Sequence, residues 1–343
     1  MRPTGASTTL PRPRQPWLIR LVGQRSVQLT ILGWVAANAL VLLAAREILP
    51  FDWTDRSVSS RLVGANFALL EVLILMAVVY ALTRGRKLPA LAERAPARAE
   101  ARRETVLLLA YGGVGLLGGF ALGRAFGWHP FGFHLAGTLY GTHDHVAPVE
   151  ALSWAAYNLV VYALVPLIYF RRRYSAEALN LRSTDRRGDA VVIIVVLLIE
   201  SLVQYFALRS QIFSLTPGQL VLGVPLAFGL YFIGTVLPAM VFIYAILIPR
   251  FLKLTGSTAT TVILGGVTYT LMHLWDAWTV FSSPAAAALS VAFLFFTYFG
   301  PGMMKTFLTI RTGNAWVHVW AYHALAPHTF HDTPMIVRVF RIR

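Results

Sequence analysis

The chain has 343 residues, of which 57% are hydrophobic, and its mean hydropathy is +0.62. This composition excludes an ordinary soluble domain, because apolar runs of about 20 residues, the length that crosses a bilayer core, recur along the sequence. Lys and Arg outnumber Asp and Glu by 30 to 15, but they gather in short segments between apolar runs. That distribution is typical of membrane topology, so nucleic acid is not an expected partner. The absence of cysteine excludes disulfides, thiol nucleophiles and thiolate metal ligands.

The apolar runs predict an all-α fold, a polytopic transmembrane helix bundle of about nine spans. The predicted spans cover residues 27–46, 62–83, 105–123, 151–170, 190–208, 219–249, 260–278, 285–308 and 314–331. The sixth span is longer than one crossing requires, and we expect one long helix or a helix kinked at Pro238. In the eighth span the sequence Gly300-Pro-Gly302 predicts a break.

Composition also divides the chain into segments. Four predicted spans precede a carboxy-terminal core that contains the other five. The segments are a basic disordered arm at 1–25 without a cleavable signal peptide, amino-terminal transmembrane helices at 26–170, a basic loop at 171–189 and the core at 190–343. Within the amino-terminal part, the basic inner loop 84–103 is either an amphipathic connector on the inner leaflet or a solvated linker. The outer loop 124–149 contains several histidines.

The positive-inside rule sets the expected orientation. With the amino terminus in the cytoplasm, the basic segments fall in the inner loops, and only the tail with Arg338, Arg341 and Arg343 departs from the rule. The Ala-, Arg- and Gly-rich composition indicates the cytoplasmic membrane of a bacterium. In this topology eight of the nine histidines lie on the outer side or in the outer half of the bilayer, and His318 lies toward the inside.

Histidines and carboxylates near the outer ends of the last spans are candidate metal ligands. His273 and Asp276 are three residues apart, which places them on one helical face, where they form a metal-binding pair, a proton relay or a helix-end cap. His323, His328 and His331 follow in the ninth span. Because imidazole and carboxylate are ligands of zinc and other divalent metals, these five residues are our predicted metal site. The loop sequence His143-Asp144-His145 either adds to this site or faces solvent.

Glu200 is the second kind of candidate. It lies midway along the fifth predicted span, with Gln204 one turn later, and Glu71 is similar in the second span. A buried glutamate in this setting is either a general acid or base, or a neutral group bonded to Gln204 or to a neighbouring helix. We therefore consider Glu200 a catalytic candidate together with His273 and His323.

Four short motifs in the carboxy-terminal part occur in a fixed order. They are Ile248-Pro-Arg-Phe-Leu-Lys253, Tyr269-x-x-x-His273, Arg311-Thr-Gly-Asn-Ala-Trp316 and His323-x-x-x-Pro327. Residues 190–331 thereby resemble the CPBP family (CAAX proteases and bacteriocin-processing enzymes, also called Abi), which are polytopic intramembrane proteases. The resemblance implies a membrane-embedded peptidase in which a glutamate activates water while histidines, here His273 and His323, assist and stabilise the oxyanion.

The family's Glu-Glu-x-x-x-Arg motif is absent from this chain. Alignment on Pro249 and Arg250 puts Ala239 and Met240 at the two glutamate positions and Tyr244 at the arginine position. Neither alanine nor methionine accepts a proton, so neither can replace a general base.

Three functions follow as alternatives. The first is a divergent CPBP-like hydrolase in which Glu200 or Asp276 replaces the missing glutamates. The second is a metal-dependent membrane enzyme of another class, with His273, Asp276, His323, His328 and His331 at its centre. The third is a catalytically dead binding or immunity protein. The expected partners are membrane lipids and, for an enzyme, a membrane-associated peptide or a small-molecule substrate.

Overall fold

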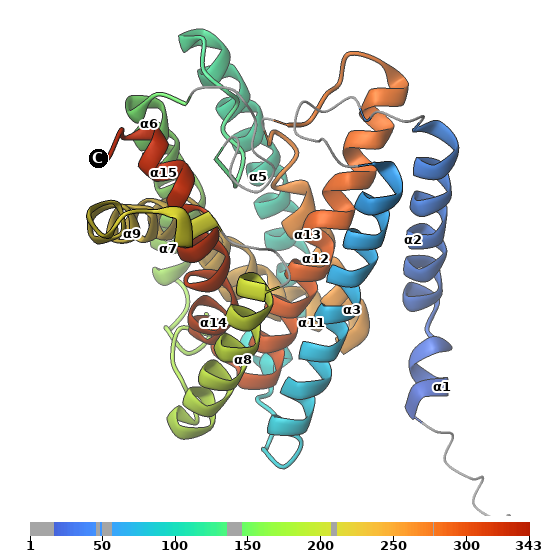
Figure 1. The fold of residues 1–343 in the computed structure, drawn as a ribbon. Helices are drawn as coiled ribbons and strands as arrows, with labels where there is room; N and C mark the ends of the chain where they lie inside the picture. The colour runs from blue at the N-terminus through green and yellow to red at the C-terminus, as the bar shows by residue number, and fades with distance from the viewer. Residues whose placement is uncertain (1–16, 46–48, 50–56, 136–145, 207–210, 277) are drawn as a thin grey trace, which may run out of the picture.

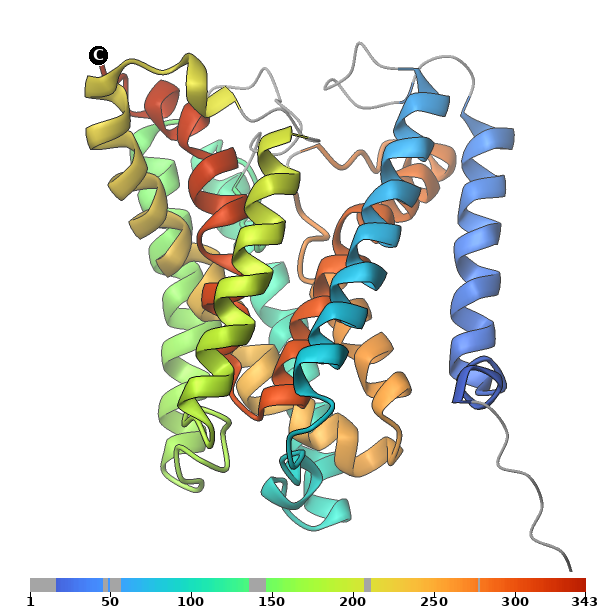
Figure 2. The same cartoon turned by 60° about the horizontal axis from the view of Figure 1, so that its bottom comes forward.

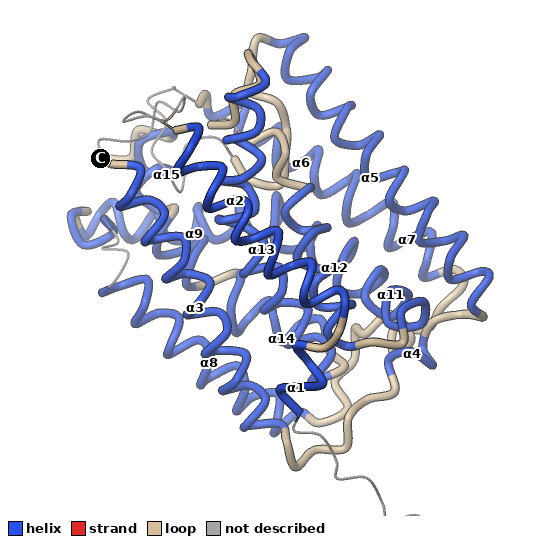
Figure 3. The backbone as a smooth tube through the Cα atoms, turned by 90° about the vertical axis from the view of Figure 1, so that its right-hand side faces the viewer, coloured by secondary structure: helices blue, strands red, loops and turns tan. Residues whose placement is uncertain are grey.

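The computed structural model describes residues 17–45, 49, 57–135, 146–206, 211–276 and 278–343. Within these ranges every regular element is a helix and none is a strand (Figure 3). The prediction of an all-α helix bundle is therefore confirmed. The predicted loop site at His143, Asp144 and His145 lies outside the described residues.

Among the described residues, seven helical segments are long and apolar enough to cross a membrane, which confirms a multi-pass membrane protein. They are α2 (Arg25–Ala44), α3 (Val58–Thr83), α5 (Arg98–Phe126), α6 to α7 (Pro148–Arg171), α8 (Arg186–Phe206), α9 to α11 (Pro217–Thr255) and α13 (Pro284–Thr312). Helix α2 lies at the edge of the bundle (Figures 1 and 2). A short helix, α1 (Trp17–Val22), precedes it within the segment predicted as a disordered arm.

The two other predicted spans, 260–278 and 314–331, are shorter or broken helices. Helix α12 (Thr258–Leu271) ends before His273. The last part of the chain is divided into α14 (Ala315–His318), η5 (Val319–His323), η6 (Ala326–His331) and α15 (Thr333–Val339). Pro327 and Pro334 interrupt its regular hydrogen bonding. The wide turns η5 and η6 have π-helical geometry, which is frequent at functional sites.

Two proline-containing helices are continuous. The segment from α9 to α11 is one helix of 39 residues in which π-helical turns, η3 (Phe232–Val236) and η4 (Met240–Leu247), lie on both sides of Pro238. The break predicted in the eighth span was wrong, because α13 runs unbroken through Pro301. Gly302 lies directly against Gly266 of α12. Because glycine has no side chain, these two residues allow α12 and α13 to pack closely and do not break the helix.

The helix from α9 to α11 is the centre of the bundle. Its residues from Pro238 to Phe251 are all buried, and this stretch is apolar around most of its circumference. Such a helix must be surrounded by others, since no polar face is available for water. Helices α5 to α7 pack against it, and so do α12 and α13, so segments that precede and follow it in the chain meet around it.

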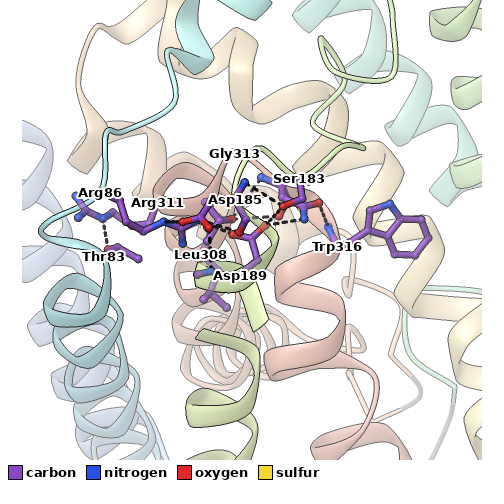
Figure 4. Close-up of polar contacts among 12 residues, drawn as sticks. Thr83, Arg86, Ser183, Asp185, Asp189, Leu308, Arg311, Gly313 and Trp316 are labelled. Carbon is purple, nitrogen blue, oxygen red and sulfur yellow. Dashed lines mark hydrogen bonds and ion pairs between the residues drawn. The ribbon is translucent and has the colours of Figure 1, made fainter. Parts of the chain in front are cut away.

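A polar network closes one end of the bundle (Figure 4). Arg86, just after α3, forms ion pairs of 2.8 Å with Asp185 and with Asp189, which also accepts a hydrogen bond from Asn314 at 3.0 Å. Arg311 donates to the hydroxyl of Thr83 at 2.7 Å. The Arg311 to Trp316 motif therefore joins the ends of α3, α8 and α13, which is a structural role.

The basic segment 84–103 also packs on this end of the bundle. Leu91, in the short helix α4 (Leu91–Arg94), is 1% exposed. Arg94 donates to the carbonyl of Gly313 at 2.6 Å, and α5 begins only four residues later, at Arg98. Gly313 ends α13 with a φ of +66°, which glycine adopts without strain. Because the helix ends there, the carbonyl of Gly313 can accept the hydrogen bond from Arg94.

Candidate metal centre

His134, His328 and Asp332 converge in the interior, with one ligand atom from each lying within 4.8 Å of the others. All three side chains are buried, and Asp332 is 0% exposed. They come from three places: the loop after α5, the π-helical turn η6 and the residue before α15. We call these three residues the triad.

The loop that carries His134 enters the bundle and is held by backbone hydrogen bonds. The N–H of Phe133 donates to the carbonyl of Met272 at 3.1 Å, and the hydroxyl of Thr235 donates to the carbonyl of Phe133. The carbonyl of Gly132 accepts from Trp154 at 2.9 Å and from Asn158 at 2.8 Å. These bonds satisfy the polar backbone of a loop that lies among apolar helices.

One ring nitrogen of His134 faces Asp332. Nδ1 lies 3.2 Å from the carbonyl of Leu135, which can only accept, so Nδ1 carries the proton and Nε2 has the lone pair. Nε2 is 3.7 Å from Oδ2 of Asp332. Burial lowers the pKa of His134 to about 3, so the ring is neutral at neutral pH. A neutral imidazole whose other nitrogen donates to a carbonyl is the usual form of a metal-ligating histidine.

His328 and Asp332 are one helical turn apart and directly bonded. Nδ1 of His328 is 2.8 Å from Oδ2 of Asp332, and the ring of Tyr231 stacks on His328 with centroids 4.9 Å apart and an angle of 6°. These contacts fix the His328 ring on both its edge and its face.

A second group of polar side chains adjoins the triad. Nδ1 of His273 donates to the carbonyl of Tyr269 at 2.7 Å, and the hydroxyl of Tyr269 is 3.1 Å from Nε2 of His323. The His273 ring stacks on Tyr298 with centroids 3.7 Å apart, and the Tyr298 hydroxyl donates to Asp276. Nε2 of His273 and Nδ1 of His323 have no hydrogen-bond partner in the described part of the chain.

Five histidine rings thus form a continuous group in the interior. Successive ring centroids are 5.7 Å apart from His318 to His323, 5.0 Å from His323 to His328, 5.4 Å from His328 to His134 and 6.3 Å from His134 to His273. Each ring is at most 5% exposed. A set of buried, largely uncharged imidazoles can bind a metal or exchange protons, because each retains a basic nitrogen.

The predicted site residues are distributed differently from our expectation. Of the five predicted ligands, His328 belongs to the triad, His273 and His323 adjoin it, and His331 is partly exposed beside it. Asp276 instead accepts hydrogen bonds from Tyr298 and from Trp278. The expectation that His273 and Asp276 share one helical face was wrong, because α12 ends at Leu271 and both residues lie in the turn that follows.

The predicted catalytic residue Glu200 lies elsewhere. It accepts a hydrogen bond from Gln204 at 2.9 Å and contacts Glu71 of α3, and it is not a member of the triad. These contacts correspond to the second alternative given for Glu200, a group bonded to Gln204 or to a neighbouring helix.

Sequence reasoning did not include His134 and Asp332 among the ligands. The spacing His328-x-x-x-Asp332 could have indicated Asp332 as a ligand, because side chains four residues apart lie close together on a helix. The apolar neighbours of His134, namely Phe131, Phe133 and Leu135, could have indicated a loop that is buried.

Comparisons of this chain with protein-family models, with curated proteins and with solved structures find no match.

The triad fits a divalent cation. Ligand atoms about 2.0 Å from a tetrahedral zinc ion are about 3.3 Å apart, so only a modest contraction of side-chain positions is needed. Two imidazoles and one carboxylate suit zinc and several other first-row metals.

Proposed function

We propose that this membrane protein is a metal-dependent membrane enzyme, that its reaction is a hydrolysis, and that His134, His328 and Asp332 hold a divalent cation, with zinc as the best match. The observation that carries the proposal is the convergence of these three buried ligand atoms within 4.8 Å. Burying a carboxylate and two imidazoles among apolar helices is costly unless they have a common partner.

Three protein ligands leave coordination positions open, and a metal in such a site activates a bound water or polarises a carbonyl. The surrounding residues would then bind and move protons. Nε2 of His273 retains a lone pair, because Nδ1 donates to a carbonyl, and it lacks a hydrogen-bond partner among the described residues, so it can accept a proton from water or from a substrate. The Tyr269 hydroxyl is placed to keep His323 in one orientation.

The substrate in this proposal is a membrane-associated peptide or small molecule, and membrane lipids are the surrounding partners. We also propose that residues 190–331 are a divergent CPBP-like core. The order of the four motifs supports this relation. So does the proximity of Tyr269, His273 and His323, which are the residues that the resemblance brings to the site.

We further propose the cytoplasmic membrane of a bacterium, with the amino terminus in the cytoplasm. The support is the distribution of basic residues. The basic segment that follows α3, the loop 171–187 and the end of α11 lie at the end of the bundle that carries α1 (Figure 2). Positive residues gather on the cytoplasmic side of membrane proteins.

A second candidate function is a metal-free hydrolase. The 2.8 Å bond between His328 and Asp332 favours it, because a carboxylate that holds a histidine in one tautomer prepares the ring as a general base. In this candidate Asp332, and not Glu200, would compensate for the missing glutamates of the CPBP motif.

The experiment is metal analysis by plasma mass spectrometry of the detergent-purified protein. We expect close to one equivalent of metal in the parent protein and its loss in His328→Ala and Asp332→Ala. His318→Ala is the matched control, since it removes another buried histidine of the same segment that lies outside the triad. Each variant must elute as the parent does in size-exclusion chromatography.

Metal-free protein from metal-replete cells would overturn the metal proposal. A cellular phenotype that is lost in His328→Ala would then favour the metal-free hydrolase. Retention of the phenotype in both triad variants would favour the binding or immunity protein.

A further inference from the structure

Glu71 of α3 and Glu200 of α8 meet inside the bundle, at residues that the metal centre does not use. Both helices are membrane-spanning segments that pack together (Figures 1 and 2). Glu200 is 2% exposed, and its carboxyl group lies against that of Glu71. Gln204 donates a further hydrogen bond, of 2.9 Å, to Oε1 of Glu200.

The close approach of the two carboxyl groups requires a proton. An ionised carboxylate has only acceptor atoms, so two of them cannot hydrogen-bond to each other. Oε1 of Glu71 and Oε2 of Glu200 are buried and receive no hydrogen bond from any described group. Two adjacent negative charges in an apolar bundle would also repel each other at short range.

The charged and titratable groups around the pair determine how many protons it holds. Helix α13 contributes Lys305, which is 2% exposed and whose charge interacts with Glu200. Turn η5 contributes Tyr322, and α8 contributes Gln204, both of them uncharged. One shared proton leaves the pair with a single negative charge, which balances Lys305. Either no proton or two protons would leave a net charge in the bundle.

The amine of Lys305 also lies over an aromatic ring. Its Nζ lies 3.7 Å from the centre of the Tyr269 ring, which is a favourable position for a cation. Because the hydroxyl of Tyr269 contacts His323, Lys305 and Tyr269 connect the two glutamates to the histidine group.

We propose that Glu71 and Glu200 form a binding site for one proton within the membrane, with Lys305 as its counter-charge. The pair is a separate site from the triad. The proton is exchangeable, and it lies next to side chains that lead toward the proposed catalytic centre.

Infrared spectroscopy of the purified full-length protein tests this proposal. A protonated carboxylic acid has a C=O stretching band that is distinct from that of a carboxylate and shifts in D2O. We expect one such band at neutral pH, and we expect its loss in Glu71→Gln and, separately, in Glu200→Gln, because the remaining carboxylate then balances Lys305. Glu93→Gln, which changes an exposed carboxylate, should keep the band.

The variant Lys305→Met should change the intensity of the band in the opposite direction. Without the positive charge the pair should take up a second proton, so the band should about double. Metal content should equal that of the parent in all of these variants, which separates this proposal from the metal centre. A parent spectrum without a band that depends on both glutamates would overturn the proposal. So would a band that disappears on addition of sodium ions, because a bound cation would then occupy the site.

Discussion

Glu104 of α5 and Arg250 of α11 form a buried ion pair that joins the amino-terminal helices to the carboxy-terminal core. Nε of Arg250 donates to Oε2 of Glu104 at 2.8 Å, and the two side chains are 1% and 2% exposed. The other carboxylate oxygen accepts from Tyr174 at 2.7 Å. Arg250 belongs to the segment that resembles the CPBP motif, and its partner comes from outside that resemblance.

We predict that Glu104→Ala strongly destabilises the protein. Removal of one partner leaves an unpaired buried charge, which typically costs about 3–5 kcal/mol. The control is Glu100→Ala, one turn earlier, where the carboxylate is partly exposed and lies 3.8 Å from Arg103 and 3.4 Å from Arg173. We expect a loss of less than about 1 kcal/mol there. Thermal unfolding in detergent measures both, and equal melting temperatures would contradict the prediction.

The loop that carries His134 depends on two glycines of α5. A Cβ at Gly123 would overlap the carbonyl oxygen of His129, and one at Gly119 would overlap that of Phe131. We predict that Gly123→Ala displaces the loop and lowers both the melting temperature and the metal content. Gly113→Ala is the matched control, because a Cβ there meets nothing within 4 Å. It should leave both quantities unchanged or raise stability slightly, since alanine favours helix more than glycine does. Identical behaviour of the two variants would contradict this account.

The apolar runs allowed the helical bundle to be predicted, because a chain in lipid must satisfy its backbone hydrogen bonds within helices. The sequence could not show whether Pro301 breaks α13. That outcome depends on how closely α12 approaches Gly302, which is a tertiary contact. It likewise could not show that α12 ends at Leu271, before His273.

The candidate site was predictable only in part. The alternating topology predicted that most histidines gather in one half of the bilayer, and His328, one of the predicted ligands, belongs to the triad. His134 was not assigned, because its apolar neighbours indicate a buried loop but do not show which helices that loop enters between. Glu71 could not be assigned as the partner of Glu200, since that pairing depends on α3 and α8 being neighbours.

Asn314 provides a test of the network at the end of the bundle. Its Oδ1 accepts from the N–H of Trp316 at 3.1 Å, and its Nδ2 donates to Asp189. Asn314→Asp keeps the acceptor that caps α14 but places a second carboxylate against Asp189, so we predict a loss of stability of about 1–3 kcal/mol. Asn314→Asp combined with Asp189→Asn should recover part of that loss, because the hydrogen bond is restored in reverse. A double variant that is less stable than the additive sum would contradict the prediction.

Metal removal should destabilise the folded protein if the triad holds a cation. A ligand that binds only the folded state stabilises it by about 2.7 kcal/mol when its free concentration is 100 times its dissociation constant. We therefore predict that a chelator lowers the melting temperature of the parent protein, that added zinc restores it, and that Asp332→Ala responds to neither. Tyr298→Phe is the control, because Tyr298 lies beside the triad but its hydroxyl donates a hydrogen bond to Asp276. It should keep the full response to chelator and zinc. An unchanged melting temperature of the parent in chelator, with its metal demonstrably removed, would mean that the triad is not the metal site.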